Sequence, residues 1–170
     1  MFKFVLAILL IAAISAEKFT DFKVKDLDGN VVDFKKYKSQ CVLVVNTASK
    51  GFLSVENMKY LNKLSEKHPS LKIVAFPSDV FGQEKKNNSE LKEWFKTWKA
   101  TYDVLEKTDA HTADVYKFLI KQAGDRKVIW NYGKYLVEKD GTTVEMFGPQ
   151  AGAIFWSSLD RKMKKCVEST

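Results

Sequence analysis

The residues of this 170-residue chain that are best suited to redox chemistry are its two cysteines, Cys41 and Cys166. They lie far apart in the sequence, so neither belongs to the C-x-x-C pair of a dithiol redox motif. Cys41 opens an apolar run that is typical of a buried strand, and Cys166 lies at the end of the last predicted helix. Two interpretations stay open: a disulfide between them, or a buried thiol at Cys41 and a solvent-exposed thiol at Cys166.

Other kinds of catalytic chemistry have less support in the sequence. His68 and His111 lie in separate loops, with no cysteine or paired carboxylate at metal-ligand spacing. Ser49 and Ser78 have no evident histidine partner, which disfavours a serine hydrolase. The eight glycines are scattered and form no phosphate-binding loop. We therefore predict neither a metal site nor a cofactor.

An alternation of strands and helices must position any functional residue. Apolar runs at 42–45 and 71–76 indicate strands buried on both faces, the second stopped by Pro77. Two hairpins are expected, over 19–34 and over 135–147, each around a turn rich in Asp and Gly. The spacing of apolar residues predicts helices over 55–68, 90–100, 114–122 and 154–167. This order favours an α/β fold, with a central mixed β-sheet flanked by helices and an N-terminal β-hairpin.

The first sixteen residues have the pattern of a secretory signal peptide. A positive charge precedes an apolar run over 4–14, and small residues follow it. That run is shorter than the roughly 20 residues that a membrane-spanning helix needs. We therefore expect residues 1–16 to be removed, and residues 17–170 to form one secreted, extracellular domain with no transmembrane segment. Asn87, which begins an Asn-Asn-Ser sequon, is then a candidate for N-glycosylation.

The formal net charge is +7, but the lysines are spread along the chain. The densest cluster, at 161–165, falls in the last turns of a predicted helix, where cations suit the helix dipole. No basic motif with interleaved aromatic residues suggests nucleic-acid binding. We interpret the charge as a solvated basic face and expect no nucleic-acid partner.

Three motifs point to a known family. Segment 46–50 (Asn-Thr-Ala-Ser-Lys) follows a buried strand and resembles the Asn-Val-Ala-Ser-Lys segment of glutathione peroxidases. Segment 76–84 resembles their Phe-Pro-x-Asn-Gln-Phe-Gly-x-Gln-Glu signature, and segment 130–137 resembles Trp-Asn-Phe-x-Lys-Phe-Leu-Val. The motifs occur in order over nearly the whole predicted domain at 17–170. The resemblance implies a thioredoxin-like fold and a monomer, since the short chain is similar to the branch without a tetramer-forming loop.

The resemblance also implies which positions form the peroxidatic site. Peroxide reduction needs a thiolate or selenolate that attacks the O–O bond, and its position corresponds to Gly51, which has no side chain. The family's glutamine, an amide donor, matches Val80, so we predict that this donor is lost. Trp130 and Asn131 are retained, and we expect Trp130 to be a core aromatic residue. The resolving cysteine of subfamilies that recycle through an internal disulfide corresponds to Lys96.

Two neighbouring positions also depart from the family pattern. Asp79 stands in place of an asparagine, and its charge would oppose a nearby anion. Phe52 stands where the family has glycine, and we expect it to fill the former pocket.

These residues predict a secreted glutathione peroxidase-like protein that is catalytically inactive and acts by binding an unknown protein or small molecule. Glutathione would be a ligand only if the family's binding is retained. One alternative is an active glutathione- or thioredoxin-dependent peroxidase of the oxidative stress response. Its nucleophile would come from Cys41, from a partner, or from a cysteine or selenocysteine at position 51 in the native transcript. The other alternative is a secreted structural or storage protein.

Overall fold

A computed structural model describes residues 16–149 and 153–169, without the side chains of residues 153–157. All but the last residue of the predicted signal peptide at 1–16 lies outside the described residues. Within the described part of the chain, no helix is both long enough and apolar enough to span a membrane.

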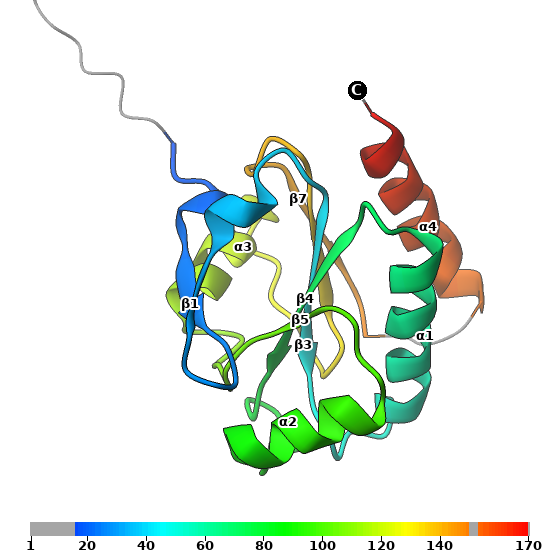
Figure 1. Cartoon of the computed structure of the whole chain (residues 1–170). Coiled ribbons are helices and arrows are strands. Elements are labelled where there is room, and N and C mark those ends of the chain that lie inside the picture. The colour runs from blue at the N-terminus through cyan, green and yellow to red at the C-terminus, as the bar shows by residue number, and fades with distance from the viewer. Residues whose placement is uncertain (1–15, 150–152, 170) are drawn as a thin grey trace, which may run out of the picture.

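A five-stranded mixed sheet forms the centre of the fold (Figure 1). Its strand order is β5-β4-β3-β6-β7: β3 is parallel to β4 and β4 to β5, whereas β6 is antiparallel to both β3 and β7. Strands β1 and β2 form a separate antiparallel hairpin. The strands are β1 (Lys23–Lys25), β2 (Val31–Asp33), β3 (Val42–Thr47), β4 (Lys72–Pro77), β5 (Asp103–Val104), β6 (Lys134–Val137) and β7 (Val144–Phe147). The predicted mixed sheet and N-terminal hairpin are confirmed.

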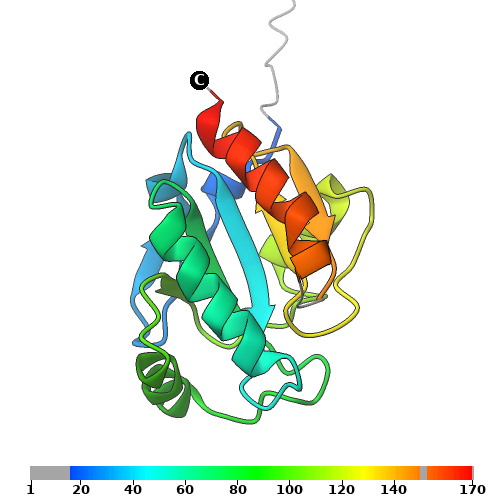
Figure 2. The same ribbon diagram turned by 90° about the vertical axis from the view of Figure 1, so that its right-hand side faces the viewer.

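Helices cover both faces of this sheet. They are α1 (Ser54–Lys67), α2 (Asn88–Thr97), α3 (Asp114–Gln122) and α4 (Ala153–Glu168). Helices α1 and α4 lie side by side over one face, as Figure 2 shows, and their buried residues share a core cluster with those of α2. Helix α3 and the β1–β2 hairpin pack on the other face. The two covered faces explain why the sequence has strands without a polar side.

Strand β3 shows how the sequence builds two cores at once. Successive side chains of a strand point to opposite faces. Val42 and Val44 belong to the cluster with α3, whereas Leu43 and Val45 belong to the cluster with α1. All six residues of β3 are buried, so the strand passes through the middle of the molecule. The loop that follows β3 therefore starts from a fixed position at the carboxyl end of the strand.

Strand β5 and the carboxyl ends of β4 and α2 differ from the prediction. Strand β5 was not expected, because a strand of two residues has no detectable periodicity. Pro77 is the last residue of β4 and does not stop the strand before it. Helix α2 ends at Thr97 and not at residue 100, and two residues later Lys99 has a φ of +53°, in the left-handed region that a right-handed helix cannot include.

The two cysteines are joined by a disulfide in the structure, with their Cα atoms 6.1 Å apart. Cys41 directly precedes β3, and Cys166 lies near the end of α4. Both side chains are buried in the core cluster that contains α1. The bond therefore ties the last helix to the start of the central strand.

Candidate functional site

Gly51 lies in the loop between β3 and α1, and hydrogen bonds hold this loop in place. The hydroxyl of Ser54, the first residue of α1, lies 2.6 Å from the carbonyl oxygen of Ala48 and 2.5 Å from that of Gly51. The N–H of Ser54 also donates to the carbonyl of Gly51 at 2.9 Å. Position 51 is therefore fixed at the N-terminal end of α1, where the helix dipole favours a negative charge.

Polar groups surround the space beside Gly51. A β-carbon placed on this glycine would lie 3.1 Å from Ser54 Oγ, 3.4 Å from Asn131 Nδ2 and 3.4 Å from Gln83 Oε1. The backbone φ of Gly51 lies outside the left-handed region, so a side chain is possible here after its neighbours move by a few tenths of an ångström. Any side chain at this position would meet amide and hydroxyl groups.

Asn131 supplies the most buried of these groups. Its side chain is fully buried, and its Nδ2 donates to Gln83 Oε1 at 2.5 Å. The other amide atom, Oδ1, has no hydrogen-bond partner among the described residues. Buried polar atoms without a partner are uncommon and cost free energy, so they mark places where a ligand or a missing group would be satisfied.

Gln83 is the functional residue that sequence reasoning missed. The resemblance to the family matches Val80 with the glutamine that supplies an amide donor. In the structure Val80 packs against the core cluster that contains α3. The loop reads Phe-Gly-Gln-Glu, one residue shorter than the family pattern Phe-Gly-x-Gln-Glu. Gly82 turns this loop with a φ of +74°, and its N–H donates to the carbonyl of Asp79 at 2.8 Å. The shortened loop was the available signal, because it changes the spacing between Asp79 and the glutamine, which lies beside Gly51 in the structure.

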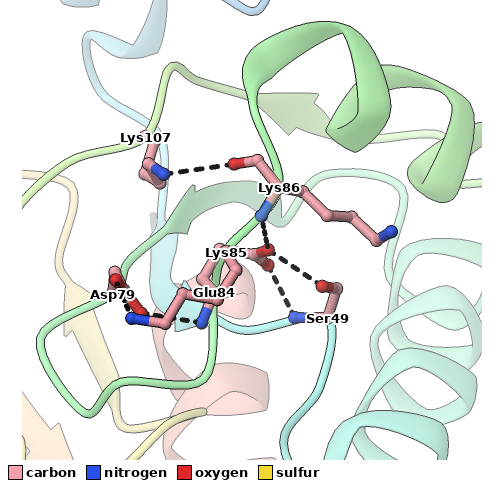
Figure 3. A network of polar contacts seen from close by, with 6 residues as sticks. All are labelled: Ser49, Asp79, Glu84, Lys85, Lys86 and Lys107. Carbon is pink, nitrogen blue, oxygen red and sulfur yellow. Dashed lines mark hydrogen bonds and ion pairs between the residues drawn. The ribbon is translucent and has the colours of Figure 1, made fainter.

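A buried carboxylate anchors this loop to the segment before Gly51, as Figure 3 shows. Glu84 is fully buried and accepts hydrogen bonds from Ser49 N–H at 2.6 Å, from Ser49 Oγ at 2.8 Å and from Lys86 N–H at 3.1 Å. Asp79 accepts from Glu84 N–H at 3.0 Å and from Lys85 Nζ at 2.8 Å. The hydrogen bond from Lys85 holds the pKa of Asp79 below its ordinary value. The charge of Asp79 is thus paired within its own loop.

Trp130 and Phe52 lie on the surface, so both expectations about their packing are wrong. Trp130 is 38% exposed and not a core residue, and its ring packs against Phe81 with the centroids 5.3 Å apart. Phe52 is 92% exposed and fills no pocket. The cause is local: Trp130 follows a loop and not a strand, and Phe52 lies in the turn before α1, whose inner positions are occupied by Ser54 and its hydrogen bonds.

The remaining predicted positions lie at α2. Lys96 is exposed, and its ammonium is 4.0 Å from the carboxylate of Glu93. Asn87 is the N-cap of α2: its side chain accepts from Glu90 N–H at 3.0 Å, and the Glu90 carboxylate accepts from Asn87 N–H at 2.9 Å. Neither residue is among the groups around Gly51, so the structure separates the resolving position from the nucleophile position.

A buried lysine lies in the same region of the sheet. Lys134 Nζ donates to the carbonyl of Tyr132 at 2.6 Å and to Asn57 Oδ1 at 3.0 Å. Desolvation by burial lowers the pKa of Lys134 to about 7. Tyr132 in turn donates its hydroxyl to the carbonyl of Ala48 at 2.9 Å, which connects this lysine to the loop of Gly51.

Together these groups favour an anion at position 51 but provide nothing that attacks a peroxide. The helix N-terminus and the amide of Asn131 would stabilise a thiolate there. The sequence holds two cysteines, and both are in the disulfide. Cys41 therefore has no thiol to offer in this structure.

Comparisons with known proteins bear on both family and fold. A family model described as "Glutathione peroxidase" matches residues 19–120. The mitochondrial glutathione peroxidase 1 of Chlamydomonas reinhardtii is 36% identical over 165 residues, which cover 91% of this chain and 81% of that protein. The chloroplastic phospholipid hydroperoxide glutathione peroxidase 1 of Arabidopsis thaliana is 39% identical over 149 residues, covering 81% of this chain and 63% of the relative.

Solved structures confirm the predicted thioredoxin-like fold. A structure titled "Crystal structure of Trgpx in apo form" has a TM-score of 0.69 and 28% sequence identity, and it covers 91% of this chain and 98% of its own. A thioredoxin family protein from Chlorobium tepidum has a TM-score of 0.58 at 14% identity, covering 86% of this chain and 92% of its own, which shows the fold alone.

The same relatives contradict the predicted extracellular location. Their names place them in the chloroplast and the mitochondrion, and neither is a secreted protein by name. A charged start followed by an apolar run was therefore insufficient to predict secretion.

Proposed function

Because this chain belongs to the glutathione peroxidase family, we propose that it keeps the family's scaffold, does not turn over peroxide, and acts by binding a partner around Gly51. The observation that carries this proposal is the state of the thiols. Thiol-dependent peroxide reduction needs a free thiolate or selenolate. Position 51 has no side chain, and the two cysteines of the sequence are bonded to each other.

The surface around Gly51 supports the binding part of the proposal. We call the exposed or half-exposed apolar residues Phe52, Phe81, Ile129 and Trp130 the Gly51 surface. Phe52 is 92% and Ile129 is 71% exposed, and Trp130 stacks on Phe81. Exposed aromatic residues that contact each other, as Trp130 and Phe81 do, are typical of interaction sites.

Charge around this surface indicates the kind of partner. Exposed cations lie close to its residues in the sequence. Lys50 precedes Gly51, and Arg126 and Lys127 precede Ile129. An apolar partner segment flanked by acidic side chains would match this pattern, since complementary charge guides association. The family makes glutathione and thioredoxin the first molecules to examine.

The proposal is tested by peroxide consumption with glutathione and, separately, with thioredoxin as the reductant. The natural sequence should show no turnover above the rate without protein. Gly51→Cys should gain turnover, because the new thiol would meet Asn131, Gln83 and the N-terminus of α1. Turnover by the natural sequence would contradict the proposal.

A matched pair of second substitutions tests the site geometry. In the Gly51→Cys background, Gln83→Leu should lower the regained activity by about tenfold, because Asn131 Nδ2 loses the acceptor, Gln83 Oε1, that orients it beside the new thiol. Val80→Gln in the same background should give no gain, because Val80 packs into the core. Gly51→Ser is the control that adds a side chain without a thiol.

Binding is tested by capture of the full chain on immobilised glutathione or thioredoxin. Phe52→Asp should weaken capture, because it replaces the most exposed apolar residue of the Gly51 surface with a charge. Val31→Asp is the matched control, since Val31 is 64% exposed and lies in β2 outside this surface. Equal capture of the two variants would count against the Gly51 surface.

A second candidate function is a peroxidase whose native residue 51 is cysteine or selenocysteine. The observation in its favour is the set of polar groups directed at the place that such a side chain would occupy. Mass spectrometry of the peptide that contains residue 51, taken from the native protein, separates the two functions. A glycine mass supports the non-catalytic protein, and a cysteine or selenocysteine mass supports the peroxidase.

A further inference from the structure

A pocket of about 510 Å³ lies between α2, the turn of the β1–β2 hairpin and the segment that leads into β5. Figure 1 shows the turn of the β1–β2 hairpin close to α2, and an ion pair of 2.6 Å between Asp28 and Lys92 joins them. We call this space the α2 pocket. It shares no residue with the Gly51 surface, and its volume falls within the range of small-molecule sites.

The floor of the α2 pocket is apolar. Leu27 comes from the hairpin turn, Phe95 from α2, and Tyr102 and Val104 from the segment at β5. Phe95 is almost completely buried, and Tyr102 donates its hydroxyl to the sulfur of Met58 in the core. These side chains are fixed by the core behind them, so the floor is preformed and would cover a flat ring or a short hydrocarbon chain.

The acidic groups of the α2 pocket are already satisfied. Asp26 accepts from the backbone N–H groups of Asp28 and Asn30 within the hairpin turn. Asp103 accepts from Lys36 Nζ at 2.9 Å and from Tyr37 Oη at 2.7 Å. With Asp28 paired to Lys92, each of the three carboxylates already accepts from donors of the protein.

Lys96 is the cation of the α2 pocket that has the weakest ion pair. Lys36 and Lys92 each contact a carboxylate within 3 Å, whereas the ammonium of Lys96 is 4.0 Å from the carboxylate of Glu93. Its side chain is flexible and exposed, and it extends from α2 beside Phe95. The α2 pocket therefore combines an apolar floor with one available positive charge.

We propose that the α2 pocket binds a small amphipathic monocarboxylate, with its apolar ring or chain on the floor and its carboxylate on Lys96. A neutral molecule would leave the lysine unused, and a cationic molecule would compete with the donors that each carboxylate already has. A dianion would need a second free cation, which the described lining of the pocket does not offer. The site is independent of the proposed function at Gly51.

The probe is 1-naphthoate, compared with 1-naphthalenemethanol, a neutral molecule with the same ring. Titration of the ¹⁵N-labelled full chain followed by NMR gives the affinity and locates the site. Naphthoate should shift the amide signals of the hairpin turn, α2 and β5 in a saturable way and bind about fivefold more tightly than the alcohol, as expected for one favourable exposed ion pair.

Lys96→Gln should remove this preference by weakening naphthoate about fivefold while leaving the alcohol unchanged. Lys121→Gln, which removes an exposed lysine from α3, is the control and should change neither affinity. Ala100→Phe, which fills the pocket, should abolish both, with a retained unfolding transition showing that the chain still folds. Equal binding of the two probes, an unchanged naphthoate affinity in Lys96→Gln, or signal changes confined to the Gly51 surface would each overturn the proposal.

Discussion

Substitution of Lys134 by methionine tests the electrostatics beneath the candidate site. In the folded chain, burial lowers the pKa of Lys134 from 10.5 to about 7. In the unfolded chain the amine returns to its ordinary pKa. Between about pH 7 and 10.5 the unfolded state therefore binds a proton that the folded state does not. The free energy of unfolding should rise with pH across this window, and the gain should be lost as the pH falls back to about 7.

The expected size of this effect follows from the shift in the pKa of Lys134. One pKa unit corresponds to about 1.4 kcal/mol. From pH 7 to pH 9 the unfolded amine stays protonated, while the folded amine goes from about half protonated to neutral. Integration over these two pH units gives about 2 kcal/mol of added stability in the natural sequence. Lys134→Met has no amine at this position and should lack this contribution.

The assay is urea unfolding of the oxidised protein at pH 7, 8 and 9, for the natural sequence and for Lys134→Met. The difference in unfolding free energy should change by about 2 kcal/mol in favour of the natural sequence as the pH rises. Other titrating groups are common to both proteins, so they cancel in this difference. Lys121→Met serves as the control for an exposed lysine. Parallel pH profiles for the natural sequence and Lys134→Met would refute the reasoning.

Three further variants test other parts of the structure. Changing both Cys41 and Cys166 to serine should lower the free energy of unfolding by about 2–5 kcal/mol, measured by denaturant titration, because the unfolded chain gains freedom. Asn87→Ala should cost about 1 kcal/mol by removing the N-cap of α2, and a thermal unfolding curve in which Asn87→Asp is equally destabilised would contradict the capping role. Gly133→Ala should cost about 1–3 kcal/mol in calorimetry, since its methyl would lie 2.5 Å from Val128 Cγ1; unchanged stability would show that this valine can move away.

The sequence was informative where long apolar patterns decide the structure. The run at 42–45 indicated β3, and the spacing of Val115, Phe118 and Leu119 gave α3 with its boundaries. The first is a continuous apolar run, as in a strand buried on both faces, and in the second apolar residues recur at the helical period. Strand β5 carries no such repeat in its two residues, so only its pairing with β4 identifies it.

The candidate site was predicted less completely, because loops decide it. Gly51 and Asn131 were found by family resemblance, and the structure brings them together. Gln83 was missed, since a loop shortened by one residue changes which side chain faces the site. The predicted burial of Trp130 and Phe52 was wrong for a related reason. Large aromatic residues are usually buried, but a turn can direct them to solvent.

The disulfide between Cys41 and Cys166 also determines how the chain responds to tension. The two cysteines are separated by 125 positions in the sequence, yet the bond keeps their Cα atoms 6.1 Å apart in the folded state. A force applied at the two ends would pass through the sulfur atoms and bypass the sheet between them. While the bond is intact, the enclosed residues cannot be extended. Its reduction would release about 400 Å of extensible chain, at about 3.4 Å per residue, so a single-molecule stretching trace would report the redox state of this pair directly.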